Sequence, residues 1–415
     1  MNPSNPWFLA AFGGVIILYH LDLIISLLNL AQFAKPLPEA MRPLYDPDTL
    51  LRCQDYHRQS TQLDLAQATT QLAVLLTFWL AGGFGWLHSW TTALGWNTTA
   101  TGTLALTLTT IATSLIALPF TLWQTFKIET AFGFNRTTLR TFFLDQIKTI
   151  LLLAIIGLPL LALIIWLFET LPYAPAAAWL TLTLFSLLMT WISPRFIMPL
   201  FLRFDPLPNG PLRDAILALS RQLDFPVADV SIVDGSRRSS KANAFFAGFG
   251  KSKRIALYDT LVESHSQDEL LAVLSHEIGH SKRGHVTRHL IIGLIESALL
   301  FAGLHFALQS PAFFEAFGIS GTPVGLGFAV FSILYKPFSL LLSLPGMWLS
   351  RVHEFEADAF ARSAMGSSTP LETALKRLSS DHLSHPAPHP LAVRLHYTHP
   401  PLLQRLAALQ AGAVA

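Results

Sequence analysis

Residues 148–170, with the sequence KTILLLAIIGLPLLALIIWLFET, decide the fold of this chain. Between Lys148 and Glu169 the stretch carries no charged residue. A helix needs about 20 mostly apolar residues to cross the hydrocarbon core of a membrane, so this stretch predicts a spanning helix. Six other apolar stretches are long enough, near 7–31, 68–90, 102–123, 175–199, 286–309 and 323–349. We therefore expect a mainly α, polytopic membrane protein with seven transmembrane helices in the lipid bilayer.

The overall composition supports a membrane protein. Of the 415 residues, 52% are hydrophobic and only 13% are charged, whereas soluble domains carry about 25% charged residues. The formal net charge of +2 is too small to favour nucleic acid as a partner. The single cysteine, Cys53, excludes an internal disulfide framework. Residues 1–6 hold no Lys or Arg, so we interpret 7–31 as a retained span and not as a cleaved signal peptide.

The basic residues between the apolar stretches predict the orientation. Alternate loops contain no Lys or Arg, namely 1–6, 91–101, 171–174 and 310–322. The loops between them, and the tail after the last span, carry all the basic residues that flank the spans. Lys and Arg concentrate on the cytoplasmic side of membrane proteins, so we expect the N-terminus outside and the tail in the cytoplasm.

Two hydrophilic regions divide the chain into four parts. We expect spans 1–5 in 1–199, an α+β part of a cytoplasmic domain in 200–285, spans 6–7 in 286–349 and the rest of that domain in 350–415. Periodicity predicts a helix over 211–223, strands over 229–234, 243–248 and 253–258 with the last two as a hairpin, a loop over 381–401 and a last helix over 401–410. Ser266 and Glu269 form a capping box that predicts a helix running through 285.

On that helix lies the sequence His276-Glu277-Ile278-Gly279-His280. Residues four apart share one helical face, so both imidazoles can bind one zinc ion. Glu277 is rotated by about 100° from His276 and can reach a water on that ion. Zinc lowers the pKa of such a water to about 7, and a carboxylate can then act as general base. The motif predicts a zinc-dependent hydrolase with one zinc ion per chain.

A catalytic zinc site needs a third protein ligand, which the segment after the seventh span can supply. The last two spans form a hairpin, so the segment 351–358 returns to the side that the zinc helix occupies. Glu354 is the candidate ligand, and Asp358, four residues on, is the candidate partner that orients a ligand His. From chemistry alone His353 and Glu356 remain alternatives.

These features together resemble the type I CAAX prenyl protease family, which are membrane zinc endopeptidases of the gluzincin class. The resemblance rests on HExxH followed by Glu-x-x-x-Asp in a chain with seven spans. It extends to five other segments: Glu129-x-x-Phe-Gly-Phe-Asn135-Arg-Thr-Thr138, Pro199-Leu-Phe201, Asn243-Ala-Phe245, Phe355-Glu-Ala-Asp358 and His399-Pro-Pro-Leu-Leu403.

The resemblance implies roles for individual residues. His276, His280 and Glu354 would bind zinc and Glu277 would be the general base. His399 and Arg405 would stabilise the oxyanion and orient the site, as a donor to developing negative charge should. Asn243 and Ala244 would lie on the edge strand to which an extended substrate adds. Chemistry alone does not choose among the neighbouring histidines, which are His382, His385, His389, His396 and His399.

The resemblance also implies a large chamber inside the seven helices. Ionisable residues inside spans normally face water or a partner. Asp22, Glu296 and Lys336, with His20 and His305, would therefore line this chamber, although His20 and His305 could equally lie at span ends and reach the membrane surface.

Three hypotheses on function remain from the sequence. The first is a CAAX-type endopeptidase acting on peptides or proteins, prenylated or not. The second is a general quality-control metalloprotease of the membrane, which usually has fewer spans. The third is a non-catalytic chamber protein with structural zinc, although such zinc normally has four protein ligands. The excess of Arg over Lys and the C-terminal sequence AGAVA favour a bacterial inner membrane over the endoplasmic reticulum, with the active site in the cytoplasm.

Overall fold

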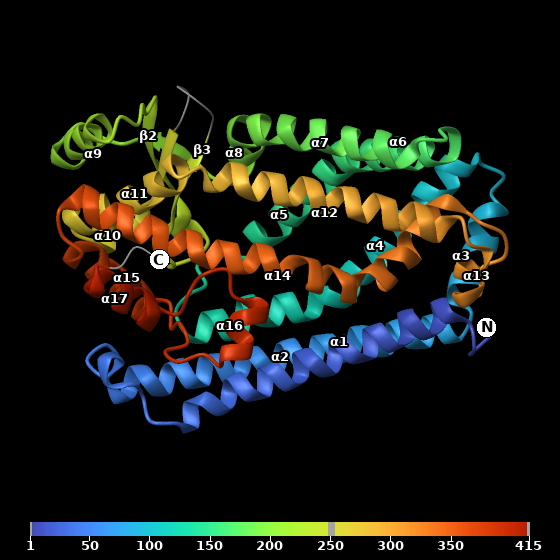
Figure 1. Ribbon diagram of the computed structural model, residues 1–415, viewed down its shortest axis with the longest axis horizontal. Helices are drawn as coiled ribbons and strands as arrows, with labels where there is room; N and C mark the ends of the chain where they lie inside the picture. The colour runs from blue at the N-terminus through green and yellow to red at the C-terminus, as the bar shows by residue number, and fades with distance from the viewer. Residues whose placement is uncertain (1, 248–253, 413–415) are drawn as a thin grey trace.

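Long helices dominate the computed structural model, which describes residues 2–247 and 254–412 (Figure 1). Within these ranges seven helical segments are long and apolar enough to cross a membrane. The predicted mainly α, polytopic membrane fold is confirmed. The segments are α1 (Pro6–Ala31), α2 (Pro47–Leu80), α4 (Thr98–Trp123), α5 with α6 (Leu139–Leu152 and Leu158–Thr170), α7 (Ala174–Ile192), α12 (His285–Leu308) and α14 (Val324–Met365).

The seven segments contact one another in a closed ring, and α14 also reaches across this ring to α4 and α6. Each of α1, α2, α4, α6, α7, α12 and α14 contacts the next one in this order, and α14 returns to contact α1. Many large apolar side chains of these helices are exposed, Ile17 and Ile155 to 70%, as expected for helices that lie in lipid. A ring of this kind is consistent with the chamber that the family resemblance implies.

The helices of two spans end at other residues than the predicted apolar stretches. Helix α2 begins at Pro47, where the Asp46 side chain accepts a hydrogen bond from the Thr49 N–H, and it ends at Leu80. The predicted end near residue 90 is wrong because Gly82 adopts φ +79°, and a separate helix, α3 (Gly83–Thr92), follows. Helix α14 does not end near residue 349 but continues to Met365. Glu354 therefore lies on the same helix as the seventh span.

One end of the ring is closed by an apolar cluster, here called the aromatic end. Helix α13 (Pro311–Ala316) and α3 meet α2 there. Trp79 is fully buried, stacks on Phe317 with ring centroids 4.6 Å apart, and donates a hydrogen bond to the Ala316 carbonyl at 3.0 Å. Close to this cluster α4 and α14 touch at two glycines, since a Cβ added to Gly102 would lie 2.8 Å from Gly325 Cα.

The other end of the ring carries the α+β domain. Its sheet has the order β1 (Phe204–Pro206), β2 (Asp229–Val233), β4 (Arg254–Tyr258) and β3 (Ala244–Ala247). Strands β2 and β4 are parallel and β3 is antiparallel to β4. The predicted strands and their antiparallel pairing are confirmed, and the predicted turn lies outside the described residues. The sequence did not predict β1.

The helices of this domain are shorter than the spans. Helix α9 (Pro211–Gln222) agrees with the prediction, and α11 (Gln267–Lys282) begins with the predicted capping box but ends before residue 285. The other helices are α10 (Asp259–Ser264), α15 (Thr369–Asp381), α16 (Pro390–His396) and α17 (Leu402–Ala411), and α8 (Met198–Phe201) ends the fifth span. The predicted loop over 381–401 is wrong in part, because α16 starts where the His389 side chain accepts a hydrogen bond from the Leu391 N–H.

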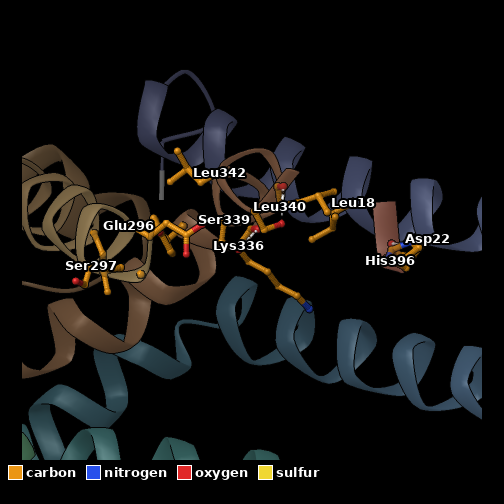
Figure 2. Close-up of a pocket in the computed structure, with 13 residues that line it drawn as sticks. Leu18, Asp22, Glu296, Ser297, Lys336, Ser339, Leu340, Leu342 and His396 are labelled. Carbon is orange, nitrogen blue, oxygen red and sulfur yellow. Dashed lines mark hydrogen bonds and ion pairs between the residues drawn. The ribbon is translucent and has the colours of Figure 1, made fainter. Parts of the chain in front are cut away.

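Ionisable residues of the spans meet in a cavity of about 590 Å³ between α1, α12, α14 and α16 (Figure 2). Asp22, Glu296 and Lys336 line it, as predicted for charges that avoid lipid. Asp22 lies beside His396, with Oδ1 3.5 Å from Nε2. His20 and His305 do not line this cavity; the Nδ1 of His20 lies 2.8 Å from the Ile16 carbonyl on its own helix.

Candidate metal centre

Helix α11 positions the HExxH motif through its capped start. The Ser266 hydroxyl accepts a hydrogen bond from the Glu269 N–H at 3.3 Å, and the Glu269 carboxylate accepts one from the Ser266 N–H at 2.7 Å. This exchange satisfies backbone donors that a helix start leaves free. Three turns of helix later, His276 Nε2 and His280 Nε2 lie 3.1 Å apart on one face.

Gly279 lets the zinc helix approach α14. A Cβ at this position would lie 3.1 Å from Phe360 Cβ and 3.2 Å from Ala357 Cα, which is closer than ordinary packing allows. The close approach brings Glu354 to the two imidazoles. Its Oε1 lies 3.2 Å from His280 Nε2, and its Oε2 lies 3.6 Å from His276 Nε2.

The spacing of these atoms fits a zinc ion. Within the described part of the chain, His276, His280 and Glu354 are the set of three His, Cys, Asp or Glu side chains whose ligand atoms all lie within 4.8 Å of one another. Tetrahedral zinc with bonds of about 2.0–2.1 Å separates its ligand atoms by about 3.3 Å. Two nitrogens and one carboxylate oxygen are also a donor set typical of catalytic zinc.

A buried ion-pair network supports this set. Asp358 Oδ1 lies 2.9 Å from His276 Nδ1, the nitrogen that faces away from the ligand cluster. Arg405 donates to both Asp358 oxygens at 2.6 and 2.8 Å, and its Nη1 lies 3.0 Å from Glu354 Oε2. Burial alone would lower the pKa of Arg405, but the hydrogen bond and the charge of Asp358 outweigh burial. The pKa of Arg405 is therefore raised above its ordinary value. The guanidinium therefore stays charged and holds both carboxylates ionised.

The alternatives His353 and Glu356 lie on the other side of a third histidine, His285. His285 Nδ1 lies 3.0 Å from His280 Nδ1, and its Nε2 lies 2.8 Å from Glu356. Its ring stacks on His353 with centroids 3.8 Å apart and planes inclined by 5°. The sequence analysis assigned no role to His285. In the sequence, the one indication of a role for His285 is its position five residues after His280, just after the motif.

A cavity of about 490 Å³ collects most of the other predicted site residues. Glu277, His399 and Arg405 line it, and so do Asn243 and Ala244. Glu277 is half-buried and lines this space beside the ligand cluster. His399 is 65% exposed, with Nε2 3.4 Å from Glu354 Oε1. The general-base candidate and the edge-strand candidates therefore share one cavity.

The neighbouring histidines separate by their partners. His382 Nε2 accepts a hydrogen bond from the Ala242 N–H at 3.0 Å, and His385 Nε2 lies 3.0 Å from the Asn29 carbonyl. Burial lowers the pKa of both imidazoles, that of His385 to about 4. His389 caps α16 and His396 lies beside Asp22. His399 is thus the member of the group that approaches the ligand cluster, a choice that the sequence alone did not allow.

Comparisons with known proteins agree with this arrangement. Residues 26–203 match the family described as the CAAX prenyl protease N-terminal region with five membrane helices, and residues 206–413 match peptidase family M48. CAAX prenyl protease 1 homolog of Arabidopsis thaliana is 41% identical over 293 residues, covering 70% of this chain and 69% of the relative. CAAX prenyl protease 1 of Saccharomyces cerevisiae is 31% identical and covers 98% of this chain and 96% of the relative.

The solved structures include a crystal structure of S. mikatae Ste24p, which is 30% identical in sequence. It superposes with a TM-score of 0.92 over 98% of this chain and 100% of the other. Because these matches cover both halves of the sequence and the whole fold, neither the hypothesis of a quality-control protease nor that of a non-catalytic protein with structural zinc is favoured. The chain belongs to peptidase family M48, in its CAAX prenyl protease group, and is an integral membrane zinc metalloendopeptidase.

Proposed function

We propose that this protein hydrolyses peptide bonds at a single site per chain, in which His276, His280 and Glu354 hold one zinc ion. The observation that carries the proposal is the coincidence of two features at one place. Three ligand atoms lie at zinc spacing, and Glu277 lines an adjoining cavity that is large enough for a peptide segment. When bound, zinc supplies a water of lowered pKa and polarises the substrate carbonyl.

The protein side chains divide the remaining work. Glu277 takes the proton of the attacking water and returns it to the leaving amine, as a half-buried carboxylate near the reacting atoms can. Asp358 accepts the Nδ1–H of His276, which fixes the ring with Nε2 free as a ligand. Arg405 pairs with Asp358 and Glu354 and holds both in place. We assign the role of donor to the developing oxyanion to His399, because its exposed ring has fewer partners than Arg405.

The substrate backbone enters as an added strand. Strand β3 is the last in the sheet order, and no other strand among the described residues pairs with its outer edge. Asn243 and Ala244, at the start of β3, line the same cavity as Glu277. An extended peptide that pairs with this edge would pass beside the general base.

We further propose that the substrates include C-terminal peptides carrying a prenyl group. The support is that relatives matching most of the chain bear the name CAAX prenyl protease 1. A fluorogenic peptide with and without a farnesyl thioether tests the proposal. A higher kcat/KM for the farnesylated peptide is expected, and equal values for the two would overturn this part while leaving peptide hydrolysis intact.

The Glu277→Gln variant tests the chemistry. We expect it to keep its zinc, because Glu277 is not in the ligand cluster, and to lose about 10³-fold in kcat, the usual contribution of a general base. Glu263→Gln is the matched control, since Glu263 is exposed on α10 and outside the cavity. Cleavage by Glu277→Gln at the wild-type rate would sink the mechanism.

The side of the membrane and the compartment are also proposals. The Lys and Arg residues of the loops that flank the spans lie at the end of the ring that carries the metal centre, here called the metal end, and this supports a cytoplasmic active site. A bacterial inner membrane is favoured over the endoplasmic reticulum on composition. A membrane-impermeant maleimide checks the side, because the native Cys53 is fully buried. Leu94→Cys should react from outside intact cells, and Ser367→Cys should react only after lysis; the reverse pattern contradicts the orientation.

A further inference from the structure

One segment singled out in the sequence has no part in the proposed chemistry. It runs from Glu129 to Thr138 and joins the third and fourth spans. The third span ends in a π-helical stretch, Gln124–Glu129, and widened turns of this kind recur at functional positions. The segment after it is held against the protease domain.

The contact is a short backbone ladder. Asn135 pairs with Ser239 as an antiparallel bridge. On either side, the Arg136 N–H donates to the Arg238 carbonyl at 3.1 Å, and the Ser240 N–H donates to the Phe134 carbonyl at 3.0 Å. The loop between the third and fourth spans is therefore hydrogen-bonded to the chain just before β3 begins.

A network of side chains strengthens this contact. Lys241 Nζ lies 3.4 Å from Glu129 Oε2 and 3.2 Å from the Tyr56 hydroxyl. The Tyr56 hydroxyl donates to Glu129 Oε1 at 2.7 Å, so that α2 and the end of the third span meet at one carboxylate. The ammonium group also lies over the Phe134 ring, 4.4 Å from its centroid, where a cation is attracted.

Lys241 begins a run of three residues that are each tied to a different part of the protein. Lys241 contacts the membrane helices, the Ala242 N–H donates to His382 from the C-terminal region at 3.0 Å, and the Asn243 carbonyl accepts from the Tyr258 N–H of β4 at 3.0 Å. The next residue, Ala244, opens β3. The position of the outer edge of β3 relative to Glu277 is thus set from three directions.

We propose that Lys241 and Glu129 are positioning residues that hold the substrate-binding edge of β3 in register with the metal centre. This inference rests on the proposed function, because it concerns how the edge strand receives the peptide. Neither side chain lines the cavity of about 490 Å³ that Glu277 lines, so neither contacts the reacting atoms. The pair links the membrane helices to peptide binding, and its removal should weaken binding more than chemistry.

The Lys241→Met and Glu129→Gln variants test the pair in the full-length protein. For each we expect the KM of a fluorogenic peptide to rise about fivefold and kcat to change by less than about twofold, since lost uniform binding appears in KM. Inhibition by acetohydroxamic acid, which binds zinc without pairing with a strand, should keep its wild-type Ki. The double variant should be no worse than either single variant, because the two residues act as one pair.

Lys376→Met is the matched control. Lys376 is 35% exposed and pairs with Glu372, whereas Lys241 is 34% exposed and pairs with Glu129. If Lys241→Met does not fold, Glu129→Asp keeps the charge and tests the distance alone, with the same rise in KM expected. A fall in kcat at unchanged KM, additive losses in the double variant, or an equal effect of Lys376→Met each overturn the inference. Wild-type protein that neither cleaves the peptide nor binds the hydroxamate would instead refute the proposed function.

Discussion

Helix α14 makes two close crossings that serve different purposes. It is 42 residues long, which corresponds to about 63 Å at 1.5 Å per residue. Near its start it touches α4 at Gly102 and Gly325, beside the aromatic end. Near its end it touches α11 at Gly279, where Glu354 meets two histidines (Figure 1). Both crossings depend on a missing side chain, but only the second brings polar groups together.

The two crossings differ in the kind of side chain that is buried beside each of them. The aromatic end buries apolar rings such as Trp79 and Phe317. It is therefore stabilised mainly by dispersion contacts between side chains, which replace contacts with lipid. The metal end buries ionised groups such as Asp358 and Arg405, which are costly to desolvate unless each is paired. We infer that the aromatic end contributes stability, and that the metal end gives up stability for a defined geometry. The predictions below test this division, beginning with the largest effect.

Gly279→Leu should have the largest effect on activity. The added side chain cannot fit against Ala357 and Phe360, so α11 and α14 must separate. A displacement of about 1 Å at a catalytic site costs about 100-fold in rate, and zinc affinity should fall with it. Metal content and peptide cleavage are the measurements. Gly13→Leu is the control, because a Cβ there meets nothing within 4 Å. Full zinc occupancy at wild-type activity would show that the crossing does not set the site.

Asp358→Asn should have the next largest effect. The amide still packs in place but no longer supplies a charged acceptor for His276 and Arg405. Loss of a partner that orients a metal ligand typically costs 10- to 100-fold in affinity or activity, so we expect a loss of about that size. Zinc titration of the metal-free protein measures it. An affinity within twofold of wild type would assign Asp358 to packing alone.

Gly325→Leu should mainly lower stability. Its side chain would collide with the backbone of Gly102, and overpacking of this kind typically costs about 1–3 kcal/mol. We expect a lower Tm in detergent, with kcat and zinc content per folded molecule close to wild type. A loss of activity as large as that of Gly279→Leu at unchanged Tm would contradict the proposed division between the two ends.

A change at His385 should have the smallest effect on activity, because it acts only through the pH dependence of stability. His385 donates from Nε2 to the Asn29 carbonyl and accepts at Nδ1 from the Ala387 N–H. Burial lowers its pKa to about 4, whereas in the unfolded chain it is about 6.5. Since the unfolded state takes up the proton first, stability is complete above pH 6.5 and falls as the pH drops towards 4, at most by about 1.4 kcal/mol per pH unit.

His385→Gln keeps a donor and an acceptor without the titration. Its Tm should therefore fall less steeply than that of wild type between pH 6.5 and 4. His389→Gln is the comparison, because the His389 side chain also accepts a hydrogen bond from a backbone N–H, at the start of α16. Parallel pH profiles for wild type and His385→Gln would rule out His385 as the source.

The sequence by itself determined the features that depend on local chemistry. Apolar stretches such as 148–170 specify spanning helices because the lipid requires internal backbone hydrogen bonds. Ser266 and Glu269 specify the start of α11, and the spacing of His276 and His280 places both on one face of it. The family resemblance then supplied Glu354, which chemistry alone could not separate from His353 and Glu356.

The tertiary structure decided whatever depends on groups distant in sequence. It placed Glu354 at the ligand cluster by continuing α14 as one helix, although a boundary near residue 349 was expected. It separated five similar histidines by their neighbours, and it added His285 and the contact of Lys241 with Glu129. Residues far apart in sequence approach only where packing allows. Gly279 permits such an approach, but a glycine in a sequence does not reveal which helix it will meet.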